Sequence, residues 1–587
     1  MNFFKRVLST VVGIFVFFIL CSFILFFIGV SISKMTDKEV KIDKNTVLEL
    51  KLDFPVNDNS GVVEYKDFSF MNDTKREGLF DLITAIEYAA TDDNIKGITI
   101  ESNFIQAGIT QTKAIREALI RFKESGKFVT AYSDIYTQKD YYLSSVADTI
   151  FVNPVGSVDF RGLATELLYL KDFQDKYGVK MNVVRVGKYK SAVEPLLENE
   201  MSQENKEQIL SYLSSIWTNL RQEIGASRDI DSEYLDIIAN DLLARTPEKA
   251  LEVGLVDKIA YHSEYETSLR NALSINEKDK ISRINILEYT DHIGLQDHYK
   301  YNKNKIAIIY AQGEIIYGEG SVQKVGPKEV NEAIIKAKND ENTKAIVLRV
   351  NSPGGSALSS ELIWKELEEA KKVKPVIVSM GDVAASGGYY IAAGADKIFA
   401  EPTTITGSIG VFGTLPNVKG LTDKMGIHAH QVTTNDNAIP YSLFNEMTEN
   451  QEAFIREGVL DVYDLFKTRV SQGRGMSMDE VEEIAQGRVW TGEEALDIGL
   501  VDEMGGLQEA INYAVQQADI ESYQIKEYPV FKVDVMRVLR RFGLTQTAEE
   551  FSKEVLGEEV YKILEHTKTQ TERKGVQMIF PYSTEIN

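Results

Sequence analysis

The sequence predicts an α/β protein built from two copies of one domain and preceded by a membrane-spanning helix. Three features of the 587-residue chain support this prediction. The chain aligns with itself at a shift of roughly 245–248 residues, which is too long for a solenoid and suits duplicated domains. Apolar strand-like runs alternate with helical stretches in both copies, as in βαβ units whose buried sheets are covered by helices. A long uncharged segment stands near the start of the chain.

The uncharged segment covers residues 7–33 and is dominated by Phe, Ile, Leu and Val. A helix of these 27 residues, at ~1.5 Å per residue, is roughly 40 Å long and can cross the ~30 Å hydrocarbon layer. We therefore expect an uncleaved membrane anchor. A cleaved signal peptide is the alternative, because Ser31-Ile32-Ser33 has the small-x-small form of a cleavage site.

Both copies are expected to follow the same order of elements. The first begins with a strand at residues 46–52 and the second with a strand at residues 305–310. A helix and a further strand follow, over residues 82–103 and 330–351, whose sequences align with each other. The apolar run 376–395 contains an aspartate and four glycines. We interpret it as a buried strand and helix rather than a second membrane span.

These patterns divide the chain into five parts. The polar stretch between the copies is expected to be a linker, and the last part, without a counterpart in the first copy, a helical extension. In order, the predicted parts are the membrane anchor (1–34), the first copy (45–270), the linker (271–304), the second copy (305–520) and the C-terminal extension (521–587).

Composition and charge exclude several functions. Asp and Glu number 88 and Lys and Arg 65, so the formal net charge is −23 and the pI about 4.9. This balance argues against nucleic-acid binding, which needs a basic face. The single cysteine, Cys21, rules out an intramolecular disulfide and a cysteine-rich zinc or iron–sulfur site. The six histidines are scattered, so no histidine-rich metal centre is expected.

The second copy carries three glycine-rich turns, at residues 351–356, 382–389 and 406–410. Such turns leave backbone N–H groups open to a ligand, although an ordinary tight turn is the alternative. Ser386 lies in the second turn, near the start of a helix whose dipole favours a developing anion; a helix-capping serine is the alternative. The first copy has Gln138 at this position, so the scaffold forms without the serine. This difference favours a functional role.

A nucleophilic serine needs a base, and the candidate base is a lysine. His428 and His430 have strand spacing and are expected on a surface strand. Residues 185–201 of the first copy contain Lys188 and Lys190, and the second copy has no lysine at the position of Lys190. A lysine kept neutral by desolvation can act as a general base. The alternative is that both lysines are loop cations.

Four motifs occur in the order and approximate spacing of a known family. They are YKSAVEP at 189–195, NSPGG at 351–355, ASGGYY at 385–390 and TGSIG at 406–410. Together they resemble the signal peptide peptidase A family in its long, duplicated form, along essentially the whole chain. The resemblance implies a ClpP/crotonase-like α/β fold for each copy and a membrane-bound Ser-Lys peptidase.

The resemblance also implies a role for five residues. Ser386 takes the position of the nucleophile, Lys190 that of the general base, and Ser408 that of the serine that orients the lysine. The backbone N–H groups of Gly355 and Gly387 take the positions of the oxyanion hole. The implied reaction is peptide hydrolysis through an acyl-enzyme, with no metal and no organic cofactor.

The family further implies where the enzyme works and with which partners. Its members degrade signal peptides left in the membrane after secretion and assemble as homotetramers. By this resemblance we expect a single-pass protein of the bacterial inner (cell) membrane, with its catalytic part on the periplasmic side. Peptides and the membrane are the expected partners, and nucleic acid is not.

Two other functions stay open on the sequence alone. A crotonase-type acyl-CoA enzyme would share the fold and use paired backbone donors, but it would need neither the serine at 386 nor the lysine at 190. A non-catalytic membrane scaffold would need neither residue. Reaction of Ser386 with a fluorophosphonate distinguishes both from a peptidase.

Overall fold

The structure is a computed structural model that describes residues 42–59, 62–64, 78–293, 302–532 and 576–579, together with Gly13, Phe17 and Leu20. Apart from these three residues, the predicted anchor over residues 1–34 lies outside the described part of the chain. Among the described residues, no helix is both long and apolar enough to span a membrane.

The first unit is a parallel six-stranded sheet in the order β7-β5-β4-β3-β1-β8. Its strands are β1 (Thr46–Leu50), β3 (Ile95–Ile100), β4 (Phe128–Tyr136), β5 (Thr149–Val158), β7 (Lys258–Ile259) and β8 (Arg283–Asn285). Its helices are α2 (Leu79–Thr91), α3 (Ile109–Lys123), α4 (Gln138–Ser144), α7 (Gln203–Arg228), α8 (Ser232–Asn240), α9 (Pro247–Glu252), α10 (His262–Ala272) and α11 (Ile286–Ile293). Between α4 and α7, after β5, come α5 (Lys171–Tyr177), β6 (Lys180–Val186), the short 3₁₀ helix η1 (Ser191–Val193) and α6 (Glu194–Leu197).

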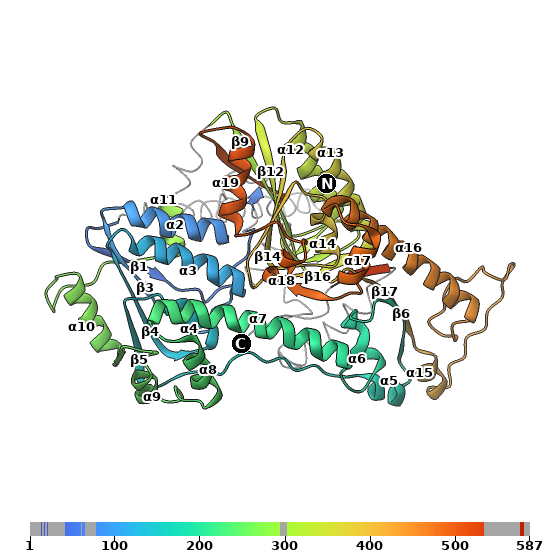
Figure 1. Cartoon of the computed structure of the whole chain (residues 1–587), viewed down its shortest axis with the longest axis horizontal. Coiled ribbons are helices and arrows are strands. Elements are labelled where there is room, and N and C mark those ends of the chain that lie inside the picture. Colours follow the sequence, from blue (N-terminus) through green and yellow to red (C-terminus); the bar gives the residue numbers. More distant parts are fainter. Residues whose placement is uncertain are drawn as a thin grey trace, which may run out of the picture.

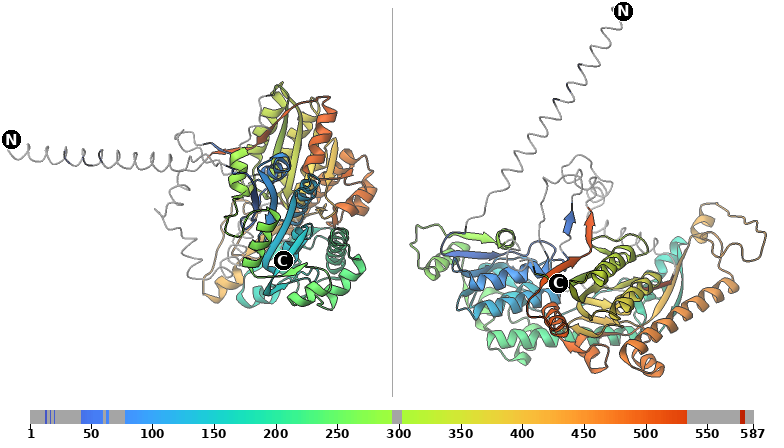
Figure 2. Two further views of the ribbon diagram at one scale, coloured as in Figure 1. Left: turned by 90° about the vertical axis from the view of Figure 1, so that its left-hand side faces the viewer. Right: turned by 90° about the horizontal axis from the view of Figure 1, so that it is seen from above.

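The second unit repeats this order around an eight-stranded sheet. Its strands are β9 (Lys305–Gln312), β12 (Thr343–Ser352), β14 (Val376–Ala385), β15 (Lys397–Ala400), β16 (Ile405–Gly407), β18 (Val489–Thr491), β19 (Glu503–Met504) and β20 (Gln524–Tyr528). Its helices are α12 (Pro327–Asn339), α13 (Ala357–Lys371), α14 (Gly387–Ala392), α15 (Lys419–Lys424), α16 (Glu449–Arg474), α17 (Met478–Ile484), α18 (Gly492–Asp497) and α19 (Leu507–Gln517). The two units lie side by side, the first in blue to green and the second in yellow to red (Figures 1 and 2).

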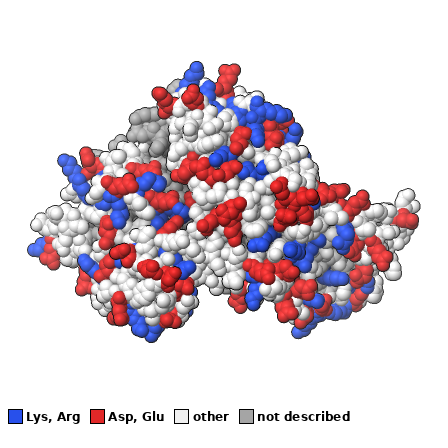
Figure 3. Space-filling view, in the orientation of Figure 1, with Lys and Arg blue, Asp and Glu red and all other residues white. Residues whose placement is uncertain are grey.

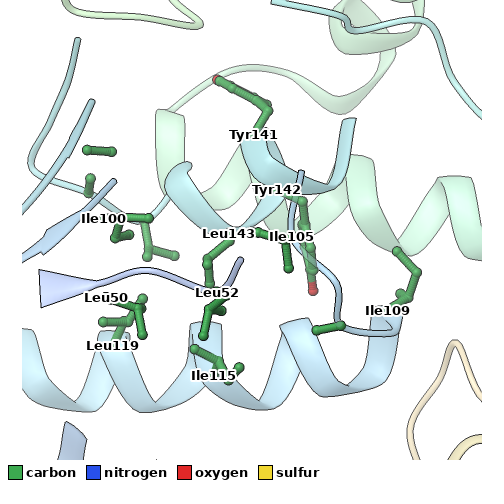
Figure 4. Close-up of a cluster of buried hydrophobic side chains, with 14 of the residues drawn as sticks. Leu50, Leu52, Ile100, Ile105, Ile109, Ile115, Leu119, Tyr141, Tyr142 and Leu143 are labelled. Atoms are coloured by element: carbon green, nitrogen blue, oxygen red, sulfur yellow. The ribbon is translucent and has the colours of Figure 1, made fainter. Parts of the chain in front are cut away.

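The core of the first unit forms between the sheet and its helices (Figure 4). Leu50 and Ile100 come from the buried strands β1 and β3, and Ile115 and Leu119 lie one helical turn apart on α3. These four side chains are at most 1% exposed. Burying a side chain of this size is worth roughly 1.5–3 kcal/mol, so the apolar strands and the apolar face of α3 hold each other in place.

A third, small sheet crosses the boundary between the units. Its order is β11-β10-β13-β22-β17-β6. The strands new here are β10 (Glu314–Ile315), β11 (Lys324–Val325), β13 (Gly354–Ser356), β17 (Val411–Asn417) and β22 (Val576–Ile579). Strand β6 of the first unit pairs antiparallel with β17 of the second along its whole length. Helix α7 also runs along both units (Figure 1), and the Ser215 hydroxyl lies 3.1 Å from the Thr491 hydroxyl. Through β6 and α7, elements of the first unit reach the second.

Two of the predicted boundaries are wrong. The expected linker at 271–304 contributes β8, which pairs with β1, and α11, which packs on the first unit. The expected extension from residue 521 contributes β20, which pairs with β9. Its described residues are strands rather than helix: β20, β21 (Val530–Lys532), which pairs with β2 (Val62–Glu64), and β22. Each main sheet needs this last strand to cover the edge of its first strand, which explains why the polar segments are ordered.

Candidate active site

Ser386 lies at the turn between β14 and α14. Its backbone has φ +55° and ψ −116°, a conformation that a residue with a side chain rarely adopts. The Ser386 N–H donates to the Gly407 carbonyl at 2.8 Å, which holds the turn, while the side chain makes no helix-capping bond. The capping alternative is therefore wrong, and the hydroxyl is free to face the loop that carries Lys190. Backbone strain of this kind is common at functional sites.

Lys190 reaches Ser386 from the first unit. It stands between β6 and η1, and its Nζ lies 2.8 Å from Ser386 Oγ. Two further contacts join Nζ to Ser408, at 3.0 Å from Oγ and 3.1 Å from the carbonyl oxygen. A neutral amine has two N–H donors and one lone pair. The two donors suit the oxygens of Ser408, and the lone pair is then directed at the Ser386 hydroxyl.

The surroundings of Lys190 favour this neutral form. The residue is 1% exposed, and burial lowers the pKa of its ammonium group well below the usual range. The backbone of the second unit packs closely around it: a Cβ added to Gly487 would lie 2.6 Å from Lys190 Cβ, and one on Gly410 would lie 3.2 Å from Lys190 Cδ. A desolvated, uncharged lysine at hydrogen-bond distance from a serine can accept the hydroxyl proton.

Gly355 and Gly387 lie next to each other. A Cβ on Gly387 would lie 3.1 Å from the Gly355 nitrogen. Gly355 follows the end of β12, and Gly387 follows the end of the neighbouring parallel strand β14, so the carboxyl ends of two adjacent strands meet here. Gly355 has φ +152°, and a Cβ there would lie 2.0 Å from the Ile315 carbonyl oxygen. Paired N–H groups without side chains can stabilise an oxyanion.

The loop of Lys190 is held by residues that the sequence analysis did not single out. Gln208 of α7 donates to the Tyr189 carbonyl at 3.1 Å and accepts from the Val489 N–H at 3.4 Å. The buried Glu194, within the YKSAVEP motif, accepts from the Ser202 N–H at 2.8 Å. Gln208 lies on a regular helix outside every recognised motif, so its sequence does not point to this role. Glu194 lies inside the YKSAVEP motif and could have been predicted from it.

The corresponding place in the first unit is filled. The side chain of Gln138, the counterpart of Ser386, accepts from the N–H groups of Arg161 and Gly162. Asp140 accepts from the N–H groups of the loop that follows β3. Phe160, the counterpart of Ser408, is 2% exposed and packs edge-on against a tyrosine. The first unit thus contributes Lys190 to the site of the second unit. Its own turn at Gln138 is filled by side chains that bond and pack within the first unit.

The remaining candidates from the sequence lie elsewhere. Lys188 is exposed, and its Nζ lies 5.0 Å from the centre of the Tyr189 ring, as expected of a loop cation. His428 and His430 are exposed in an irregular segment, so the predicted strand there is wrong. Among the residues that the structure describes, no group of three or more His, Cys, Asp or Glu side chains could hold a metal ion.

A strand from the end of the chain lies beside the serine. β22 is placed between β13 and β17, and its antiparallel register pairs Met578 with Gly355. The Met578 side chain is fully buried. Its carbonyl oxygen would lie 3.1 Å from a Cβ on Gly387. An extended segment is therefore held by sheet pairing beside Gly387, next to Ser386, the way many peptides are bound.

A strained serine beside a buried lysine, with two backbone donors at the ends of parallel strands, defines a class of α/β hydrolases that act through a serine. Comparison with known families makes the assignment specific. Residues 121–276 and 368–521 both match Peptidase family S49. The chain belongs to this family and is a serine peptidase, so the acyl-CoA enzyme and the scaffold are not supported.

The chain is also similar to named proteins. Protease 4 of Haemophilus influenzae is 39% identical over 450 residues, which cover 74% of this chain and 72% of that protein. The chloroplastic serine protease SPPA of Arabidopsis thaliana is 33% identical, over 74% of this chain and 64% of that protein. A putative signal peptide peptidase SppA of Enterococcus faecium is 37% identical over 33% of this chain and 56% of that protein.

Proposed function

We propose that the protein is a Ser-Lys endopeptidase that degrades signal peptides and similar hydrophobic peptides at the membrane. The observation that carries the proposal is the 2.8 Å contact between Lys190 Nζ and Ser386 Oγ in a site where burial lowers the pKa of the lysine. The names of the relatives, which include a signal peptide peptidase, support the substrate class.

The proposed mechanism uses the geometry of this site. Neutral Lys190 takes the proton of the Ser386 hydroxyl as Oγ attacks the peptide carbonyl carbon. The N–H groups of Gly355 and Gly387 stabilise the oxyanion; in other enzymes, one such donor is worth roughly 3–4 kcal/mol. Lys190, now charged, protonates the leaving amine, and Ser408 keeps Nζ in place. Water then attacks the acyl-enzyme. Lys190 takes a proton from this water and returns it to Ser386 Oγ as the acyl group leaves as a carboxylic acid.

The membrane and assembly assignments form part of the same proposal. We assign residues 1–34 to a single-pass anchor of the bacterial inner membrane, with both units on the periplasmic side. We also assign the enzyme to a homotetramer. The alternation of strands and helices in both units supports assigning each to the ClpP/crotonase-like type. The face shown in Figure 3 has acidic and basic side chains interspersed, consistent with partners other than nucleic acid.

Hydrolysis of a synthetic signal peptide in detergent tests the function. The full chain is expected to cleave the peptide within its apolar region, and Ser386→Ala is expected to bind it without cleavage. A polar peptide of equal length serves as the comparison substrate. Equal turnover by the Ser386→Ala variant would remove this serine from the reaction.

The pH dependence of the reaction reports on Lys190. The base must be unprotonated, so kcat/KM should rise with pH and reach a plateau above the pKa of Lys190. Because burial lowers that pKa, the midpoint should lie below the ~10.4 of a free lysine. A rate that falls as the pH rises from 6 to 9, with the protein still folded, would contradict a lysine base.

We expect a substrate to pair with β13 beside Ser386, where β22 now lies, so β22 should compete with added peptide. Met578→Asp places a charge at a fully buried position and should release the strand. We expect KM for an added peptide to fall several-fold with kcat little changed, since a tethered competitor has a high effective concentration. Val432→Asp, at a side chain 98% exposed, is the matched control. An unchanged KM in Met578→Asp would show that β22 does not compete.

A further inference from the structure

Asp382 joins the strand of the nucleophile to the first unit. It lies on β14, four residues before Ser386. Its Oδ1 accepts from the Thr110 N–H at 2.8 Å, in the first turn of α3. Gly108, the N-cap residue of α3, has no side chain for this task, and a Cβ there would lie only 2.1 Å from the Asp382 carboxylate. A carboxylate of the second unit thus caps a helix of the first.

Asn351 extends this connection to the strand that leads to Gly355. Its Nδ2 donates to Asp382 Oδ2 at 3.3 Å and to Asp58 Oδ2 at 2.6 Å. Its Oδ1 accepts from the Val383 N–H at 3.2 Å. One side chain on β12 therefore ties the ends of β12 and β14 to each other and to Asp58, which precedes α2 in the first unit.

Asp58 is itself fixed by a buried ion pair. Arg349 Nη2 lies 3.0 Å from Asp58 Oδ1, and both side chains are at most 3% exposed. Arg349 also donates to the Met380 carbonyl on β14 at 2.8 Å. Burial, with the Asp58 carboxylate as a second cause, raises the pKa of Asp382. A buried polar group that loses its partner costs free energy, so the side chains of this network are held in one geometry.

We propose that Asp382 and Asn351 are positioning residues that hold the Ser386 and Gly355 turns against the unit that supplies Lys190. The inference rests on the Ser-Lys peptidase proposed above. Because the lysine and the serine come from different units, their separation depends on how the units meet. The β6–β17 pairing holds the lysine side. The contacts of Asp382 and Asn351 hold the strands that lead to Ser386 and Gly355 against the first unit.

The test uses the full chain with Asp382→Ala, Asn351→Ala and Gly108→Ala. The last variant keeps every polar group and only pushes the Asp382 carboxylate away. Measured quantities are kcat and KM for a signal peptide, the labelling rate of Ser386 by a fluorophosphonate probe, and the thermal unfolding midpoint. We expect kcat and the labelling rate to fall by about 10²-fold, the usual cost of a misplaced catalytic group, with KM within about threefold.

A conservative variant and a control separate positioning from stability. Asp382→Asn keeps an oxygen that can accept from Thr110 N–H, so it should recover part of the lost rate. Asn219→Ala removes an exposed contact between the units, the 3.1 Å bond to Glu493, and should behave as the parent. The inference is overturned if the three variants keep the parent labelling rate, or if Asp382→Asn recovers nothing while activity tracks only the folded fraction. A parent enzyme that is not labelled at Ser386 would instead overturn the proposed function.

Discussion

Replacing Lys190 with Arg, Ala or Met should abolish peptidase activity to a similar extent, by roughly 10³-fold or more in kcat. Arginine keeps a long cation but cannot be deprotonated under working conditions, so it cannot take the Ser386 proton. Methionine keeps the apolar stem in the packed space between Gly410 and Gly487 but has no amine. Initial rates on a signal peptide, per folded molecule, measure the effect.

The neighbouring Lys188 provides the matched control. It is exposed, and Lys188→Met should leave kcat within about twofold of the parent, because surface changes are usually mild. The Lys190→Arg variant should also unfold at a lower temperature than Lys190→Met, since it buries a charge that no acidic side chain among the described residues offsets. Substantial activity in Lys190→Arg with the fold intact would show that another group is the base.

Replacing Gly387 with Val should lower kcat by roughly 10²–10³-fold, the range seen when one oxyanion donor is lost. A Cβ at this position would lie 2.7 Å from Ser360 Oγ and 3.1 Å from both the Gly355 nitrogen and the Met578 carbonyl oxygen. The added side chain would therefore enter the space between the two donors. The fold should lose no more than ~1–3 kcal/mol, which chemical denaturation measures.

Gly458 offers a comparison within another helix. It lies in α16, and a Cβ there would have no neighbour within 4 Å. Gly458→Val should therefore keep the parent kcat, and it should cost no stability, because valine has a higher helix propensity than glycine. Near-parent turnover in Gly387→Val would remove this residue from the oxyanion hole.

Much of the fold could be predicted because its strands are buried on both faces. The apolar runs that begin at residues 305 and 376 became β9 and β14. β9 continues past the predicted end at residue 310, through Ala311 and Gln312. The edge strands could not be predicted. β8 has three residues, and β20 has only two apolar side chains, Ile525 and Tyr528, in a polar stretch. Both strands therefore form only because a partner strand far away in the sequence pairs with them.

The candidate site was predictable where the two copies differ. Ser386 and Lys190 each stand in only one copy, and the motifs around them are specific. Their contact joins residues 196 positions apart, which no local pattern reveals. The same holds for Asp382, whose partner Thr110 lies in the other unit, and for β22, whose place is decided by the free edges of β13 and β17. Contacts between units depend on tertiary packing alone.

Labelling by a fluorophosphonate probe, with the modified residue mapped by mass spectrometry, tests most directly that Lys190 of the first unit activates Ser386 of the second. The full chain should be modified at Ser386, at a rate that rises with pH, and Lys190→Met should react at least about 10²-fold more slowly while remaining folded. Modification at another serine, or an undiminished rate at Ser386 in Lys190→Met, would contradict the account.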